Sequence, residues 1–113
     1  FVLEQVTGAL GLLGHTPRPF FWRTHGGAEV DLLLELKGRL LPIEVKLSGA
    51  PVVGRGLVGC MKDLSLRAGF VIHGGSSAFS LGRRVFALPA SLLSQPERLC
   101  EAMLTPERYM RSA

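Results

Sequence analysis

Two apolar segments joined by a two-residue turn constrain this chain more than any other feature. AEVDLLLEL and RLLPIEVKL flank Lys37-Gly38, and glycine at the second turn position supplies the positive φ that a tight β-hairpin needs. With these two residues at the centre of the turn, Asp31 faces Glu44 and Glu29 faces Lys46. The pattern therefore predicts both the hairpin and its register.

The two faces of this hairpin differ in character. Side chains alternate across a strand, so Asp31, Glu44, Glu29 and Lys46 project from one face. The opposite face receives only apolar side chains, from Val30, Leu32, Leu34, Leu41, Ile43 and Val45. We expect a core side and a charged side, although a bulge at Pro42, which has no N–H to donate, would shift Glu44 relative to Asp31 by one residue.

The opposed carboxylates of Asp31 and Glu44 favour a metal site. Directly opposed side chains have Cβ atoms about 4.5–5.5 Å apart, and like charges placed so are destabilising unless something compensates. Mg²⁺ takes oxygen ligands and often uses one or two carboxylates. Lys46 would then bring an ammonium beside the ion, where it could orient a water or offset phosphate charge. The simpler alternative is a solvated face with a Glu29–Lys46 ion pair.

The other segments alternate between helical and extended patterns. Apolar residues at three- and four-residue intervals predict a helix over residues 1–13, after which HTPRP breaks the chain and FFWRT reads as a first short strand. We further expect a helix over about residues 54–66, strands at FVIHGG and RRVFALP, and a short helix at Pro89–Ser94. One α/β domain over residues 1–95 is expected, with residues 96–113 forming a C-terminal helix or tail.

Composition narrows the range of partners and compartments. Thirteen Lys and Arg against nine Asp and Glu give a net charge of +4, which mildly favours a polyanionic partner. Cys60 and Cys100 have no metal-type spacing and fit free buried thiols in a reducing compartment, so we expect a cytoplasmic protein. No apolar run approaches the roughly 20 residues that span a bilayer, and no membrane partner is expected. Phe1 in place of Met suggests a piece of a longer protein.

A glycine-rich segment offers a different interpretation. Gly54, Gly56 and Gly59 form a GxGxxG between a strand and a helix, where a dinucleotide-binding fingerprint would lie. The acid expected at the end of the next strand is absent, so a glycine-rich connection is the simpler explanation. The helix N-terminus with Arg55 could still hold a nucleic-acid phosphate, and Arg23 is a second, weaker candidate for such a contact.

The hairpin residues also carry a family resemblance. Asp31, followed thirteen residues later by Glu44-Val45-Lys46, resembles the PD-(D/E)xK nuclease superfamily, although Val30 stands where that motif often has proline. More narrowly, FFWRTHGGAEVDLLLELKGRLLPIEVKLSG resembles the C-terminal domain of bacterial and archaeal AAA-type ATP-binding proteins. The resemblance implies a restriction-endonuclease-like α/β fold, with the antiparallel hairpin at the core of a mixed sheet flanked by helices.

The resemblance further implies a function. Asp31 and Glu44 would be metal ligands and Lys46 the catalytic lysine of a Mg²⁺- or Mn²⁺-dependent nuclease that hydrolyses phosphodiester bonds, with DNA as the first expectation. The superfamily often adds an acid from the first helix, for which Glu4 is the candidate, and Glu29 is a further possible site residue. The N-terminal ATPase domain of the same protein would be the partner. The alternative is a non-catalytic, nucleic-acid- or protein-binding accessory domain of that ATPase.

Overall fold

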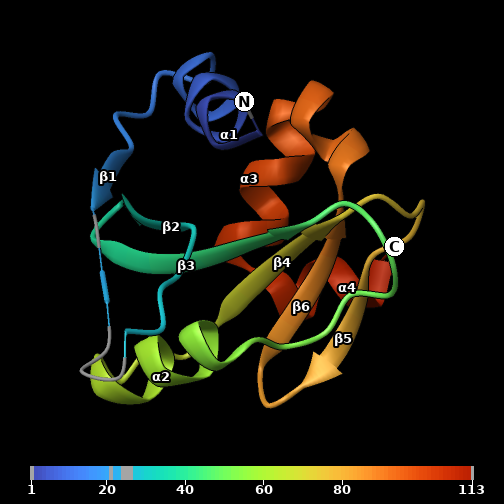
Figure 1. Ribbon diagram of the computed structural model, residues 1–113. Helices are drawn as coiled ribbons and strands as arrows, with labels where there is room; N and C mark the ends of the chain where they lie inside the picture. The colour runs from blue at the N-terminus through green and yellow to red at the C-terminus, as the bar shows by residue number, and fades with distance from the viewer. Residues whose placement is uncertain (1, 21, 24–26, 113) are drawn as a thin grey trace.

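A mixed β-sheet with helices on both faces forms the centre of the structure, a computed structural model that describes residues 2–20, 22, 23 and 27–112 (Figure 1). In the described part of the chain the strand order is β1-β2-β3-β4-β6-β5. Strands β3, β4 and β6 run parallel to one another, and the other neighbours are antiparallel. The strands are β1 (Arg18–Phe20), β2 (Leu32–Leu36), β3 (Arg39–Lys46), β4 (Gly69–His73), β5 (Phe79–Gly82) and β6 (Val85–Pro89).

Helices cover the two faces of the sheet unequally (Figure 1). One face carries α1 (Val2–Gly11), the 3₁₀ helix η1 (Ala90–Ser94), α3 (Pro96–Leu104) and α4 (Pro106–Ser112), and the other carries α2 (Arg55–Asp63). The larger core lies under the first group of helices and contains Leu34, Ile43, Phe70 and Leu88. A smaller core lies under α2.

The hairpin forms in the predicted register. Lys37 and Gly38 have φ values of 52° and 77°, the signs required in a type I′ turn, and the ladder runs without a shift from Leu36 opposite Arg39 to Leu32 opposite Ile43. Pro42 introduces no bulge, because it lies opposite Leu33. Hydrogen-bonded pairs alternate from the turn, so this is a non-hydrogen-bonded pair in which the missing N–H faces away from β2.

The side of the hairpin expected to be charged also carries apolar side chains and is covered by a helix, so the alternative of a solvated face is wrong. Leu33 and Val71 on the expected charged face form a second core with Leu57 and Cys60 of α2. Val30 also belongs to this second core and not to the face of Leu32, because β2 begins only at Leu32 and the chain bends at Asp31. The strict alternation that placed Val30 therefore does not extend beyond Leu32.

The N-terminal extended segment differs from the prediction. The strand expected at FFWRT lies instead at Arg18–Phe20, where Pro19 pairs with Leu34 as part of the edge strand β1. Proline is tolerated at an edge because its missing N–H can face solvent. Phe21 and Thr24 of the expected strand lie outside the described residues, and Arg23 forms an isolated bridge with Glu29.

The later elements follow the expected order, with additions. The predicted helix over residues 54–66 is α2, and FVIHGG and RRVFALP contain the fully buried strands β4 and β6. Arg83 and Arg84 of the second segment form a turn with positive φ. Strand β5 was not predicted, because FSLG is only four residues long and mostly exposed and so gives a weak sequence signal.

The C-terminal residues pack on the same core as the sheet. The region expected to form a C-terminal helix or tail contains the helix α3, and a second helix, α4, follows it. Leu99, Met103 and Tyr109 are almost fully buried and contribute to the larger core. This segment therefore helps to cover one face of the sheet.

Two further sequence expectations concern the cysteines and the membrane. Cys60 and Cys100 are free and buried, as predicted. Burial, with the charge of Asp63 as a smaller cause, raises the pKa of Cys60 to about 11, so this thiol stays protonated near neutral pH. Within the described residues, the helices are too short or too polar to cross a bilayer.

The close contact between α2 and the segment before β2 can be tested with a glycine substitution. A Cβ at Gly56 would lie 2.0 Å from the backbone oxygen of Glu29, so we expect Gly56→Ala to lower the free energy of unfolding by about 2–3 kcal/mol. Gly8→Ala in α1 is the control. A Cβ there meets nothing within 4 Å, and alanine in a helix should add roughly 0.5–1 kcal/mol. Urea denaturation measures both changes, and equal stability of the two variants would contradict the packing.

Candidate metal and phosphodiester site

Asp31 and Glu44 meet at the end of the hairpin away from its turn. Asp31 is the residue immediately before β2, and Glu44 lies near the end of β3, one position beyond the last β2–β3 pair. Lys46 is the last residue of β3 and is exposed. The predicted register therefore brings the two acids to the same end of the sheet, with the lysine two residues beyond Glu44.

The Asp31 side chain replaces a backbone partner of β3. The N–H of Val45 donates a hydrogen bond of 2.8 Å to Asp31 Oδ2. In a continued antiparallel ladder this N–H would point toward the chain that precedes β2, but β2 begins at Leu32. The carboxylate of Asp31 thus satisfies the N–H where the chain leaves the ladder.

The Glu44 side chain caps helix α2. The N–H of Leu57, in the first turn of α2, donates a hydrogen bond of 3.1 Å to Glu44 Oε1. The N-cap residue Gly54 has no side chain to do this, and a Cβ at Gly54 would lie 2.5 Å from Glu44 Oε1. A carboxylate is well suited to the position, because the first turn of a helix presents unpaired N–H groups and a partial positive charge.

These contacts give the glycine-rich segment a structural explanation. Gly54 leaves room for the Glu44 carboxylate, and Gly56 leaves room for the backbone oxygen of Glu29. The N-terminus of α2 already holds an anion from β3, which weakens the interpretation of GxGxxG as a dinucleotide fingerprint. The same carboxylate competes with the phosphate contact predicted for Arg55, an exposed residue in this first turn.

The electrostatics of Glu44 show that the two acids influence each other. Burial is the largest cause that raises the pKa of the half-buried Glu44, and the negative charge of Asp31 raises it further. Hydrogen bonds from Leu57 and Gly54 act in the opposite direction but do not cancel the rise. A bound cation would remove the repulsion between Asp31 and Glu44.

Glu29 occupies a different place from the one predicted. It does not extend the ladder opposite Lys46, because β2 starts three residues later. Glu29 instead forms an isolated bridge and an ion pair with Arg23, and both side chains are about half exposed, at 43% and 56%. The predicted phosphate contact Arg23 is thus engaged with an acid, while Lys46 pairs through its backbone with His73 of β4.

Glu4 is not brought to the two acids. It lies exposed in the first turn of α1, which packs on the larger core. Glu44 reaches the N-terminus of α2 on the opposite face of the sheet. A third acid from the first helix would therefore have to come from elsewhere than Glu4.

The donor set at this site fits a cation held by two carboxylates. Asp31 and Glu44 each give one oxygen to a backbone N–H, and a carboxylate has further lone pairs with which to bind an ion. Mg²⁺ commonly keeps several waters and uses one or two protein carboxylates, so two ligands suffice. Across residues 2–20, 22, 23 and 27–112, no group of three His, Cys, Asp or Glu side chains is placed to hold a metal.

Comparisons with known proteins identify one family and two relatives. The family described as "Domain of unknown function (DUF4143)" matches residues 1–93. An uncharacterized protein of Mycobacterium tuberculosis and one of Mycobacterium bovis are each 36% identical to the chain over 91 residues, which is 80% of this chain. The chain spans about 20% of the length of these curated relatives. No solved structure matches it.

The raised pKa of Glu44 makes a prediction for stability against pH. An acid whose pKa is higher in the folded state stabilises the fold fully below its unfolded pKa, and this contribution is lost as pH rises. From roughly pH 4 to 7, the unfolding free energy of the parent should therefore fall relative to that of Glu44→Gln. Urea denaturation at several pH values measures the difference. A parent that gains stability over Glu44→Gln in this range would show that the helix-capping bond dominates.

Proposed function

This chain belongs to the DUF4143 family, and from that premise we propose that it is a metal-dependent nuclease module that hydrolyses phosphodiester bonds of nucleic acid, with DNA as the first substrate to test. The observation that carries the proposal is the half-buried Glu44 carboxylate, which is held beside Asp31 although the two charges repel each other. Proteins place acids in this way where a cation or a proton is to be bound.

The order of the motif supports this proposal. Asp31 precedes β2, Glu44 and Lys46 lie on β3, and the two strands are neighbours inside a mixed sheet with helices on both faces. A PD-(D/E)xK nuclease requires this arrangement. The restriction-endonuclease-like assignment is part of the proposal and rests on the motif and on strand order.

Each residue has a separate task in the proposed reaction. Asp31 and Glu44 would hold Mg²⁺ or Mn²⁺, which when bound polarises the phosphodiester and makes water a better nucleophile. The exposed Lys46 would place its positive charge at the phosphate, where negative charge grows as water attacks. The attacking water gives a proton to solvent as its oxygen forms a P–O bond, the P–O bond to the leaving sugar oxygen breaks, and the leaving oxygen takes a proton from solvent.

The proposal also includes the neighbouring domain and the location of the module in the cell. DUF4143 domains are often found C-terminal in AAA-type ATPases, and this chain spans a fifth of its longer relatives. We therefore place it beside an N-terminal ATPase domain of the same protein. Free buried cysteines favour a reducing, cytoplasmic location.

A second candidate function is a non-catalytic accessory module of that ATPase, which binds nucleic acid or protein. The favouring observation is that both carboxylates already serve the fold, since Asp31 accepts the N–H of Val45 and Glu44 caps α2. On this reading the acids would be kept for stability, and Lys46 would have no special role.

Substitutions in the full-length protein separate the two candidates. We expect Lys46→Ala to reduce cleavage of DNA or RNA by about 100-fold or more while leaving metal affinity unchanged, because the lysine acts mainly in the transition state. Asp31→Asn and Glu44→Gln should weaken binding of Mg²⁺ or Mn²⁺ as well as activity. Calorimetry measures metal binding, and cleavage assays cover single-stranded, duplex and branched DNA and RNA.

Lys62→Ala is the matched control, since Lys62 is an exposed lysine in the last turn of α2 and should have no effect. Thermal melting of each variant guards against loss of the α2 cap. A full-length protein that neither cleaves any of these substrates nor binds metal through Asp31 and Glu44 would support the accessory module instead.

A further inference from the structure

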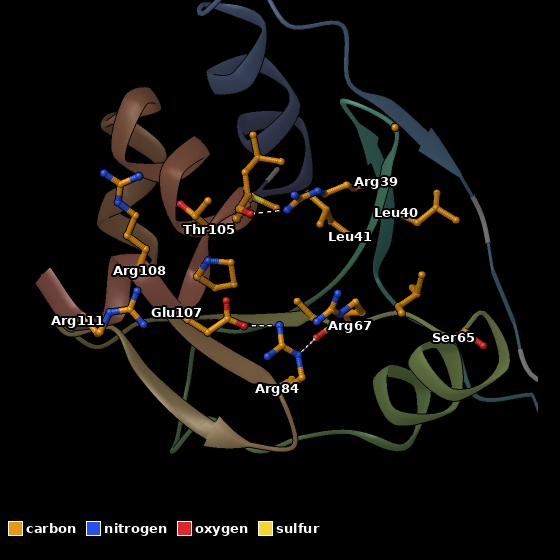
Figure 2. A pocket seen from close by; sticks show the side chains of 16 residues that line it. Arg39, Leu40, Leu41, Ser65, Arg67, Arg84, Thr105, Glu107, Arg108 and Arg111 are labelled. Atoms are coloured by element: carbon orange, nitrogen blue, oxygen red, sulfur yellow. Dashed lines mark hydrogen bonds and ion pairs between the residues drawn. The ribbon is translucent and has the colours of Figure 1, made fainter.

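A second candidate site lies at the opposite end of the sheet from Asp31 and Glu44. A cavity of about 670 Å³ is lined by the start of β3, the loop between α2 and β4, the turn before β6, and the junction of α3 and α4 (Figure 2). Arg39 begins β3, and Glu44 follows five residues later, which separates the two places by about 16 Å along the strand. The cavity is therefore distinct from the proposed metal site.

The charge of the cavity is strongly positive. Its lining contains five arginines, namely Arg39, Arg67, Arg84, Arg108 and Arg111, against the single acid Glu107. This excess of four positive charges equals the formal net charge of the whole chain, +4. The positive excess of the protein is thus concentrated around one concave surface, which raises the local concentration of anions.

Two of these arginines are positioned by hydrogen bonds. Arg39 donates a hydrogen bond of 2.5 Å to the backbone oxygen of Leu104, and Arg84 donates to the backbone oxygen of Arg67. Arg84 also forms an ion pair with Glu107 (Figure 2). These bonds tie β3 to α3 and the β5–β6 turn to α4, so the walls of the cavity are held together by the arginines themselves.

Positive charge remains after these internal bonds are made. Among the hydrogen bonds of the described residues, none is recorded from the guanidinium groups of Arg67 or Arg111, both of which are exposed. Glu107 can neutralise only one charge. Burial alone would raise the pKa of Glu107, but its own backbone N–H and the neighbouring Arg84 and Arg67 lower it, so the acid stays ionised near neutral pH.

The shape and the apolar lining indicate the size of the ligand. The half-buried Leu40 and Leu66, which pack against the smaller core, supply an apolar wall beside the arginines, and Leu104, which packs against the larger core, lines the cavity from α3. The volume falls in the range of roughly 300–1,000 Å³ that is usual for small-molecule sites. Among the described residues that line the cavity there is no aromatic side chain, whereas surfaces for single-stranded nucleic acid generally offer aromatic rings for bases to stack on.

We propose that this cavity binds a small phosphorylated ligand of the mononucleotide class, with the phosphate among the arginines that line it and the nucleoside against Leu40 and Leu66. Guanidinium groups are suited to phosphate, because they donate two parallel hydrogen bonds in a planar geometry. The proposal does not depend on the Asp31–Glu44 site.

Hydrogen-exchange mass spectrometry of the full-length protein with AMP tests the proposal, because it locates a ligand by the amides that it protects. We expect protection in residues 65–68 and 103–107, which line the cavity. Arg67→Gln and Arg111→Gln should each weaken this protection, shifting the half-saturating AMP concentration upward by about tenfold, the usual effect of losing one charged hydrogen bond. Arg83→Gln is the matched control, since Arg83 neighbours Arg84 in the same turn but does not line the cavity.

Comparing AMP with other ligands shows which chemical groups the cavity recognises. Protection by AMP at lower concentrations than by adenosine or inorganic phosphate supports a site for the phosphate and the nucleoside together. Equal protection by inorganic phosphate, or stronger protection by a single-stranded oligonucleotide, overturns it in favour of a simple anion site or a nucleic-acid surface. The proposal is also overturned if AMP does not protect residues 65–68 and 103–107, or if Arg67→Gln and Arg111→Gln leave the protection unchanged.

Discussion

The hydrogen bond from Leu57 to Glu44 connects the two halves of this fold. It joins the central strand β3 to the first turn of α2, and α2 is the helix that covers the second face of the sheet. Gly54 and Gly56 are small because this approach is close, with the Glu44 carboxylate on one side and the Glu29 backbone on the other. The close approach of α2 to β3 therefore explains three features. These are the position of the helix, the need for the two glycines and the partial burial of Glu44.

The carboxylates of the proposed metal site also stabilise the fold. Glu44 caps α2 and Asp31 satisfies the N–H of Val45, so neither acid is held only for a cation. Both contacts also fix the carboxylates on rigid backbone, which is what a metal site requires. Burial is the main cause that raises the pKa of Glu44, and the negative charge of Asp31 adds a smaller cost, which a bound ion would remove.

The sheet separates two different electrostatic environments. One end gathers acids at Asp31 and Glu44, and the other end gathers arginines around the cavity between β3, α4 and the β5–β6 turn. The parallel strands β3, β4 and β6 run from the arginine end toward the acidic end. The proposed cation site and the proposed anion site can coexist in so small a domain because the length of a strand keeps them apart.

Local patterns in the sequence determined the hairpin, its register and most of the buried elements. Turn chemistry at Lys37-Gly38 and the alternation of apolar residues act between neighbours, so they could be predicted without the rest of the chain. Only the tertiary structure decided that β2 begins at Leu32, that Pro19 lies in an edge strand, and that α2 covers the face expected to be charged. Short sequence patterns also could not predict three contacts. These are the ion pair of Glu29 with Arg23, the capping of α2 by Glu44 and the placement of five arginines around one cavity. Each depends on segments that are distant in sequence, and what brings them together is the burial of both faces of the sheet, which no short stretch of residues encodes.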